Sequence, residues 1–292
     1  MFILFPTCDT YAAIAEISLR LLARHWPGHP QVHVLHDAAK PGAQGLAGIE
    51  LHDCGREEKS PWLQRMVRFL KGREDELFLL VLDDYAMCGP ARAEMIEAGA
   101  RLMREDASVG LFPLCWYPAA RREPRSGWEG IVTLRGTPIL LQAAIWRRSW
   151  FLELASAMGP RTSPWGFETS ATQLAKQCRR DICSADISTP RYLGGHLVDG
   201  FAKNEWPLPY HNLMHRGRPA EAYTSFLRGE GFAFPSLGLG DTVAKIAEAA
   251  GVTKVVGAIE ALTGRECGCA RRRRELNRAV PYSKRRRPGD GT

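Results

Sequence analysis

Two adjacent carboxylates, Asp83 and Asp84, stand directly after the apolar run Leu77–Leu82, which is typical of a buried strand. Open α/β sheets bind ligands outside the carboxyl ends of their strands, so both side chains are placed to meet a ligand. Paired carboxylates suit a hard divalent cation, which takes oxygen ligands and often shares them with substrate phosphates. An equally weighted alternative is that the acids cap a helix beginning near Ala91 or lie in a solvated loop.

A third carboxylate, Glu168, ends the segment Ser163-Pro164-Trp165-Gly166-Phe167-Glu168. Proline and glycine are typical of a rigid loop, and we expect this loop to deliver Glu168 at the start of a helix. A carboxylate flanked by aromatic rings is a candidate general base, because partial desolvation raises its pKa towards working pH. The plainer alternative is an acid favoured in the first helical turn by the helix dipole.

Four other side chains are weaker candidates: His196, His211, Trp146 and Trp165. Either histidine could complete a metal site, although a histidine in a loop is more often a structural or surface residue. Either tryptophan could stack on a sugar ring, but packing in the core is at least as common for this residue type.

The hydrophobic pattern alternates between strands and helices along the first two hundred residues. Several of the strands are apolar on both faces, which is typical of a sheet covered by helices on both sides. We therefore expect an α/β fold with a mixed sheet. The predicted strands are Phe2–Pro6, Val32–His36, Leu77–Leu82 and Val109–Pro113, with a hairpin at Ile131–Ile145. The predicted helices are Thr10–Arg24, Leu63–Leu70, Ala91–Arg104, Arg147–Met158 and Phe167–Gln177.

Three segments together resemble a bacterial and phage branch of the nucleotide-sugar glycosyltransferases of GT-A fold. They are Leu79-Leu80-Val81-Leu82-Asp83-Asp84-Tyr85, Leu141-Gln142-Ala143-Ala144-Ile145-Trp146-Arg147-Arg148 and Pro164-Trp165-Gly166-Phe167-Glu168. Their order and spacing match the family over roughly residues 1 to 215. The resemblance implies a GT-A-like mixed, mainly parallel sheet flanked by helices. It also implies Mn²⁺ or Mg²⁺ held by Asp84 with Asp83 beside it, although the family more commonly has Asp-x-Asp than Asp-Asp.

The same resemblance implies roles for residues outside the acidic pair. Thr7 and Asp9, in the loop after the first strand, match the position that contacts the nucleotide. Arg65 matches a basic group that meets the donor diphosphate, with a solvent-facing helix arginine as the alternative. Glu168 matches the base of inverting members, which takes the proton of the attacking hydroxyl. Members of the family often take a late metal ligand from the region of His196 or His211.

The formal charge of +7 is concentrated at one end of the chain. Residues 265–292 hold ten basic residues against three acids, whereas residues 1–264 hold 29 of each. Dense arginines can contact nucleic acid in a salt-dependent manner, but a solubilising end without a partner is about equally expected. Cys267-Gly268-Cys269 and the basic residues after it resemble a segment of phage-derived proteins with no defined function, and a cysteine pair alone is too few ligands for zinc.

The chain has no apolar run long enough for a membrane helix and no typical signal peptide, so we expect a cytoplasmic protein. Its eight cysteines show no paired spacing, which favours reduced thiols over a disulfide framework. We expect a GT-A-like domain over residues 1–215, a linker with short helices over 216–264, and a basic, partly disordered tail over 265–292.

The sequence favours a metal-dependent glycosyltransferase that uses a nucleotide-sugar donor. Its acceptor could be a surface glycan or, because phages glycosylate hydroxymethylated bases, DNA. The alternative is a nucleic-acid-binding protein whose α/β body is catalytically silent. A nucleotidyltransferase ranks below both, because Pro6-Thr7-Cys8-Asp9 offers no Gly-rich basic loop for a triphosphate.

Overall fold

The computed structural model describes residues 1–37, 40–43, 45–54, 62–115, 117–178, 180–187, 192–193, 196–197, 206–215, 218–219 and 224–232. All of them belong to Met1–Phe232, the first of two units into which the chain divides. The predicted tail 265–292 and most of the predicted linker region 216–264 lie outside the described residues. The proposed domain boundary at residue 215 therefore stays a prediction.

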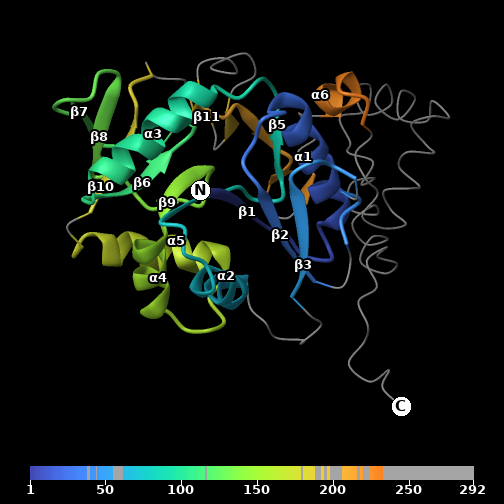
Figure 1. Cartoon of the computed structure of the whole chain (residues 1–292), viewed down its shortest axis with the longest axis horizontal. Coiled ribbons are helices and arrows are strands. Elements are labelled where there is room, and N and C mark those ends of the chain that lie inside the picture. Colours follow the sequence, from blue (N-terminus) through green and yellow to red (C-terminus); the bar gives the residue numbers. More distant parts are fainter. Residues whose placement is uncertain are drawn as a thin grey trace, which may run out of the picture. The chain divides into compact units, whose positions relative to one another are not determined.

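A nine-stranded sheet of order β3-β2-β1-β4-β9-β6-β10-β8-β7 forms the centre of this unit (Figure 1). Its first four strands are parallel neighbours: β3 (Ile49–Asp53), β2 (Val32–His36), β1 (Phe2–Pro6) and β4 (Leu77–Leu80). Every residue of β1, β2 and β4 is buried, as their apolar runs predicted. The edge strand β3 was not predicted, because polar residues interrupt its short apolar pattern and it is only partly buried.

The other half of the sheet contains β9 (Ala144–Arg147), β6 (Val109–Pro113), β10 (Asp181–Ala185), β8 (Ile131–Arg135) and β7 (Arg121–Pro124). Of the nine strands, β9 and β8 run opposite to the rest, so the predicted mixed, mainly parallel α/β sheet is confirmed. The hairpin predicted at 131–145 is wrong. Strand β8 pairs with β7 and β10, whereas β9 lies between β4 and β6.

Helices cover both faces of the sheet (Figure 1). Helices α2 (Trp62–Lys71), α4 (Arg148–Ser156) and α5 (Pro164–Ala175) pack together and share one core cluster with β1 and β4. Helices α1 (Ala12–His25) and α3 (Ala93–Glu105) lie on the opposite side of the strands. Gly99 lets α3 approach closely, because a Cβ atom there would lie 2.5 Å from the ring of Phe112.

Short elements complete the unit. Strand β5 (Tyr85–Met87) follows the acidic pair and runs antiparallel to β13 (Tyr210–Asn212). Two further two-stranded ladders join β11 (Tyr192–Leu193) to β12 (His196–Leu197) and β14 (Met214–His215) to β15 (Arg218–Pro219). The last described helix is α6 (Thr224–Gly229). Within the described residues, no helix is both long and apolar enough to cross a membrane.

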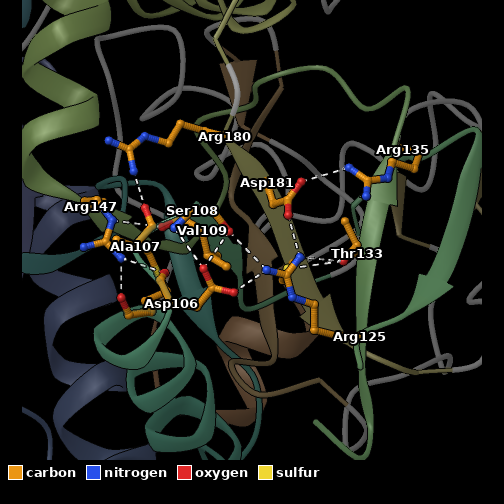
Figure 2. A network of polar contacts seen from close by, with 12 residues as sticks. Asp106, Ala107, Ser108, Val109, Arg125, Thr133, Arg135, Arg147, Arg180 and Asp181 are labelled. Atoms are coloured by element: carbon orange, nitrogen blue, oxygen red, sulfur yellow. Dashed lines mark hydrogen bonds and ion pairs between the residues drawn. The ribbon is translucent and has the colours of Figure 1, made fainter. Parts of the chain in front are cut away.

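A network of ion pairs joins the segment after β7 to β10 and to the turn after α3 (Figure 2). Arg125, just after β7, donates to the carboxylates of both Asp106 and Asp181, which lie on separate elements. Arg135 donates to the other oxygen of Asp181 at 2.8 Å. The half-buried Arg125 guanidinium thus connects the turn after α3 to the start of β10.

Candidate active site

The carboxyl ends of β1, β2 and β4 lie at the same edge of the sheet and bring most of the predicted site residues together. Asp83 and Asp84 occupy the turn after β4, where Asp83 is buried and Asp84 is half-buried. The Thr7 hydroxyl, just beyond β1, donates to Asp83 Oδ2 at 2.9 Å in the protein interior. Neither acid caps α3, because the residue before that helix is Arg92 and no side chain caps it.

The acidic pair is strongly desolvated. Burial, and then the neighbouring charge of Asp84, raises the pKa of Asp83 to about 8, while the Thr7 hydrogen bond lowers it in part. Burial likewise raises the pKa of Asp84 to about 7. Among the described residues, no side chain donates a hydrogen bond to the Asp84 carboxylate. Within that part of the chain neither carboxylate forms an ion pair, and the charge of Arg65 offsets the raised pKa of Asp83 only in part.

The first loop faces these carboxylates. Burial, and then the charge of Asp83, raises the pKa of the Cys8 thiol to about 11. The pKa of Tyr11 rises to about 12 through burial and then through Asp83 and Asp84. The negative potential of the pair thus extends across the loop after β1. Thr7 is buried and donates to Asp83, whereas Asp9 is exposed. The nucleotide contacts predicted for both residues stay predictions.

Arg65 reaches the site from α2 and is buried, so the alternative of a solvent-facing arginine is wrong. Its Nη1 donates to the backbone oxygen of Thr7 at 3.2 Å and to the carboxylate of Asp37. Its Nε is buried without a hydrogen-bond partner among the described residues. Such an orphaned guanidinium donor can serve an incoming anion.

Asp37 is a site residue that the sequence reasoning missed. It follows β2 directly, just as Asp83 follows the β4 run, so the strand-end argument already contained the signal. Burial raises the pKa of Asp37, and the adjacent Arg65 opposes that shift. The pair ties helix α2 to the carboxyl end of β2 and fixes the direction of the guanidinium.

Glu168 lies in the first turns of α5 rather than at the end of a loop. The helix already begins at Pro164, because Ser163 caps it by accepting from Gly166 N at 3.1 Å and proline is tolerated at the first helical position. Glu168 Oε1 accepts from Leu141 N at 2.7 Å. Burial raises the pKa of Glu168, and the Leu141 hydrogen bond opposes the shift.

Tyr85 connects Glu168 with the acidic pair. Its hydroxyl lies 3.4 Å from the Leu141 oxygen, and the residue is buried with its ring stacked on Tyr210 at 4.2 Å. The pKa of Tyr85 is raised well above its ordinary value by burial, and the charges of Asp84 and Glu168 both contribute. The carboxylates of Asp84 and Glu168 thus both lie close enough to Tyr85 to raise the pKa of its hydroxyl.

The two candidate tryptophans differ in exposure. Trp165 is 69% exposed on α5, three residues before Glu168. Trp146 is fully buried in β9 and packs edge-on against Phe151 and Phe167. Stacking of a sugar on Trp146 is therefore excluded by its burial, and the core interpretation is correct for this residue.

The candidate histidines lie on short strands, and only their backbones are among the described parts of the chain. His196 belongs to β12, and its proposed metal role stays a prediction. His211 belongs to β13, where its register partner is Ala86, two residues after Asp84. Leu213 N also donates to the Asp84 backbone oxygen at 2.7 Å. The backbone alone therefore places His211 on a segment adjoining the acidic pair.

The donor set at this edge fits a hard divalent cation. Carboxylate oxygens from Asp83 and Asp84 are the ligands that Mg²⁺ and Mn²⁺ prefer. Neither carboxylate forms an ion pair among the described residues, and the charge of Arg65 lowers the pKa of Asp83 only in part. A bound cation would stabilise both ionised forms. The buried Nε of Arg65 lies at the same edge and has no partner among the described residues. The half-buried carboxylate of Glu168 acts on Tyr85, the residue that follows Asp84.

Comparisons with protein-family models and with curated proteins find no match for this chain. Among solved structures, residues 1–349 of S. aureus TarS in complex with UDP match with 17% identity and a TM-score of 0.43, over 64% of this chain and 59% of that one. A cytidylyltransferase from Leptospira borgpetersenii matches with 12% identity and a TM-score of 0.42, over 64% and 76%. A UDP-glucose pyrophosphorylase complexed with UDP-glucose matches with 9% identity and a TM-score of 0.42, over 63% and 90%. At these TM-scores the similarities do not identify a function for this chain.

Proposed function

We propose that this protein is a metal-dependent glycosyltransferase that moves a sugar from a nucleotide-sugar donor to an acceptor hydroxyl. The observation that carries the proposal is the desolvated pair Asp83 and Asp84 at the carboxyl edge of the sheet, which forms no ion pair within the described residues. Burying two adjacent carboxylates is costly, so a chain that keeps them there is suited to binding a cation.

Asp84, with Asp83 beside it, would hold Mn²⁺ or Mg²⁺. When bound, such a cation neutralises the charge that develops on a departing nucleotide diphosphate. The Thr7 hydroxyl fixes Asp83, which leaves the more exposed Asp84 to face the ligand. Of the two candidate histidines, the β13–β5 register favours His211 over His196 as a further ligand, because β5 begins directly after Asp84.

Arg65 would hold the donor diphosphate at the same edge. Its Nη1 is engaged by Thr7 and Asp37, while its buried Nε retains an unused donor among the described residues. The Asp37 ion pair keeps the side chain in one direction, so little conformational freedom is lost when an anion binds. Asp9 is the exposed residue of the first loop that we propose for the nucleoside.

Glu168 would remove the proton from the attacking hydroxyl in an inverting reaction. Its raised pKa brings a carboxyl group closer to working pH, which improves a general base. The hydrogen bond from Leu141 N holds Oε1, so the carboxylate keeps a fixed orientation. The exposed ring of Trp165 in the preceding turn offers a platform for an acceptor sugar or base.

The decisive test is donor turnover with UDP- and GDP-sugars, with and without Mn²⁺, for wild type and Asp84→Asn. We expect the variant to lose the metal-stimulated rate by at least about 100-fold, because charge stabilisation by a cation contributes several kcal/mol. Glu97→Gln is the matched control, since Glu97 is an exposed acid on α3 that pairs with Arg104. Unchanged metal-stimulated turnover in a folded Asp84→Asn chain contradicts the proposal.

A nucleic-acid-binding protein is the second candidate, favoured by the ten basic residues within 265–292. Melting-temperature shifts separate the two, because a ligand that binds only the folded state raises stability. A shift with nucleotide sugar and Mn²⁺ that chelator abolishes supports the enzyme, whereas a shift with DNA alone supports the binder. Both shifts together favour a sugar transferase that acts on DNA.

A further inference from the structure

A second group of potential metal ligands lies within the sheet, on β2 and β3. His33 projects from β2, and Glu50 and His52 project from the edge strand β3. The parallel register pairs His33 with Glu50 and Leu35 with His52, so the three side chains emerge on one face. None of them belongs to the proposed transfer site, which lies at the carboxyl ends of the strands.

The ligand atoms of this cluster have the spacing that a tetrahedral metal requires. His33 Nδ1 lies 2.9 Å from His52 Nε2 and 3.2 Å from Glu50 Oε2, and His52 Nε2 lies 3.6 Å from Glu50 Oε1. Bonds of about 2.0–2.1 Å in a tetrahedral zinc site place ligand atoms about 3.3 Å apart. Three donors of the types that zinc binds therefore lie close to the spacing that such a site requires, and one atom from each residue lies within 4.8 Å of the others.

The protein holds these side chains in place. The His33 and His52 rings pack against the Phe69 ring of α2 at centroid distances of 5.2 and 5.0 Å. His33 is buried, whereas Glu50 remains about half exposed, which leaves an entry path and room for a fourth ligand such as water. Burial lowers the pKa of both histidines, which favours the neutral imidazole that metals bind.

Hydrogen bonding satisfies the metal-free cluster poorly. His33 Nδ1 is approached by His52 Nε2, by Glu50 and, at 3.4 Å, by Nη2 of Arg73. One nitrogen cannot donate to Glu50 and accept from Arg73 in the same protonation state. A cation would accept a lone pair from each of the three ligands. Arg73, whose guanidinium lies 4.4 Å above Phe69, is the competing charge that a metal must displace.

We propose that His33, Glu50 and His52 form a binding site for a divalent transition metal, with zinc as the best fit, that cross-links β2 to the edge strand β3. Two imidazoles and one carboxylate favour zinc, cobalt or nickel over magnesium. The metal would stabilise the outer edge of the sheet. This site is independent of the transfer reaction proposed for Asp84.

The test measures Zn²⁺ and Co²⁺ binding by equilibrium dialysis on the full chain carrying Cys267→Ser and Cys269→Ser, so that this cysteine pair cannot contribute. With Asp84→Asn included to remove the other proposed cation site, we expect one equivalent of zinc, a visible Co²⁺ spectrum of tetrahedral type, and a higher melting temperature with zinc. His52→Asn and Glu50→Gln should each weaken binding at least about tenfold and remove the Co²⁺ bands.

Control variants distinguish this site from zinc binding elsewhere on the chain. His29→Gln, which removes a histidine outside the cluster, should leave unchanged the affinity of the zinc that gives the tetrahedral Co²⁺ spectrum. Arg73→Gln should tighten binding, because it removes the competing positive charge. His52 and Glu50 are partly exposed, so their variants should fold, as circular dichroism can verify. Absence of zinc binding, or equal affinity in wild type, His52→Asn and Glu50→Gln, overturns the proposal.

Discussion

Asp84→Asn should stabilise the metal-free protein at alkaline pH, although it should abolish the proposed activity. The folded-state pKa of Asp84 is about 7, against an ordinary value of 3.8, because burial disfavours the charged form. The folded protein therefore holds a proton that the unfolded chain has already released. Its free energy of unfolding falls as pH rises from about 4 through about 7, where the folded state is half ionised, and levels off above that pH.

The size of the effect follows from that shift. A difference of about three pKa units corresponds to about 4 kcal/mol, and partial exposure of Asp84 to water reduces it to about 2–4 kcal/mol. Asparagine has no charge to desolvate, so the variant should gain this amount at pH 8.5. At pH 5 the gain should be less than half as large, because the folded wild type is protonated there.

Urea denaturation of wild type and Asp84→Asn at both pH values, with chelator present, measures the difference. The exposed-site variant Glu97→Gln should show no comparable gain. Adding Mg²⁺, which imidazoles hold poorly, should stabilise wild type more than Asp84→Asn at pH 8.5. Equal stability of the two chains at pH 8.5 in chelator would refute the conclusion that Asp84 is desolvated and uncompensated.

Three further changes test other parts of the molecule. Glu168→Gln keeps an oxygen that accepts from Leu141 N and removes a desolvated charge, so we expect thermal stability no lower than that of wild type. We also expect a turnover number about 100- to 10,000-fold lower, and a full rate would show that Glu168 is only a structural contact. Arg125→Ala should lower the free energy of unfolding by about 1–3 kcal/mol in urea titrations. Arg125→Lys should recover only part of this loss, because a lysine cannot donate to Asp106 and Asp181 with the geometry of a guanidinium. Deletion of 265–292 should weaken DNA binding and reduce the dependence of DNA affinity on salt, as filter-binding or anisotropy titrations at several salt concentrations can measure. If the deleted and full-length chains show the same salt dependence, residues 265–292 do not contact the nucleic acid.

Much of the fold and part of the candidate site could be predicted from local pattern. The runs Phe2–Pro6, Val32–His36 and Leu77–Leu82 are apolar on both faces, and the structure buries the corresponding strands in the centre of the sheet. Strand-end logic then placed Asp83 and Asp84 correctly at the carboxyl edge. The same logic would have reached Asp37 had it been applied to every predicted strand.

Long-range pairing was beyond such reasoning. The local pattern of residues 131–145 fits a hairpin as well as it fits the observed arrangement. In that arrangement β9 lies between β4 and β6. Burial of single side chains was equally hidden, since Trp146 and Arg65 have sequence surroundings that fit an exposed or a buried position. Both depend on which distant segments pack against them.

Local sequence pattern was enough to predict the α/β class and the position of the acidic pair after a buried strand, and it shows that the excess of basic residues lies in 265–292. Those properties follow from periodicity and charge, which are local quantities. Three contacts could be seen only in the folded chain: Thr7 donates to Asp83, Arg65 is buried against Asp37, and His33 lies beside Glu50 and His52 across two strands. Contacts between residues far apart in the chain arise from strand order and register, which are selected by packing of the whole domain.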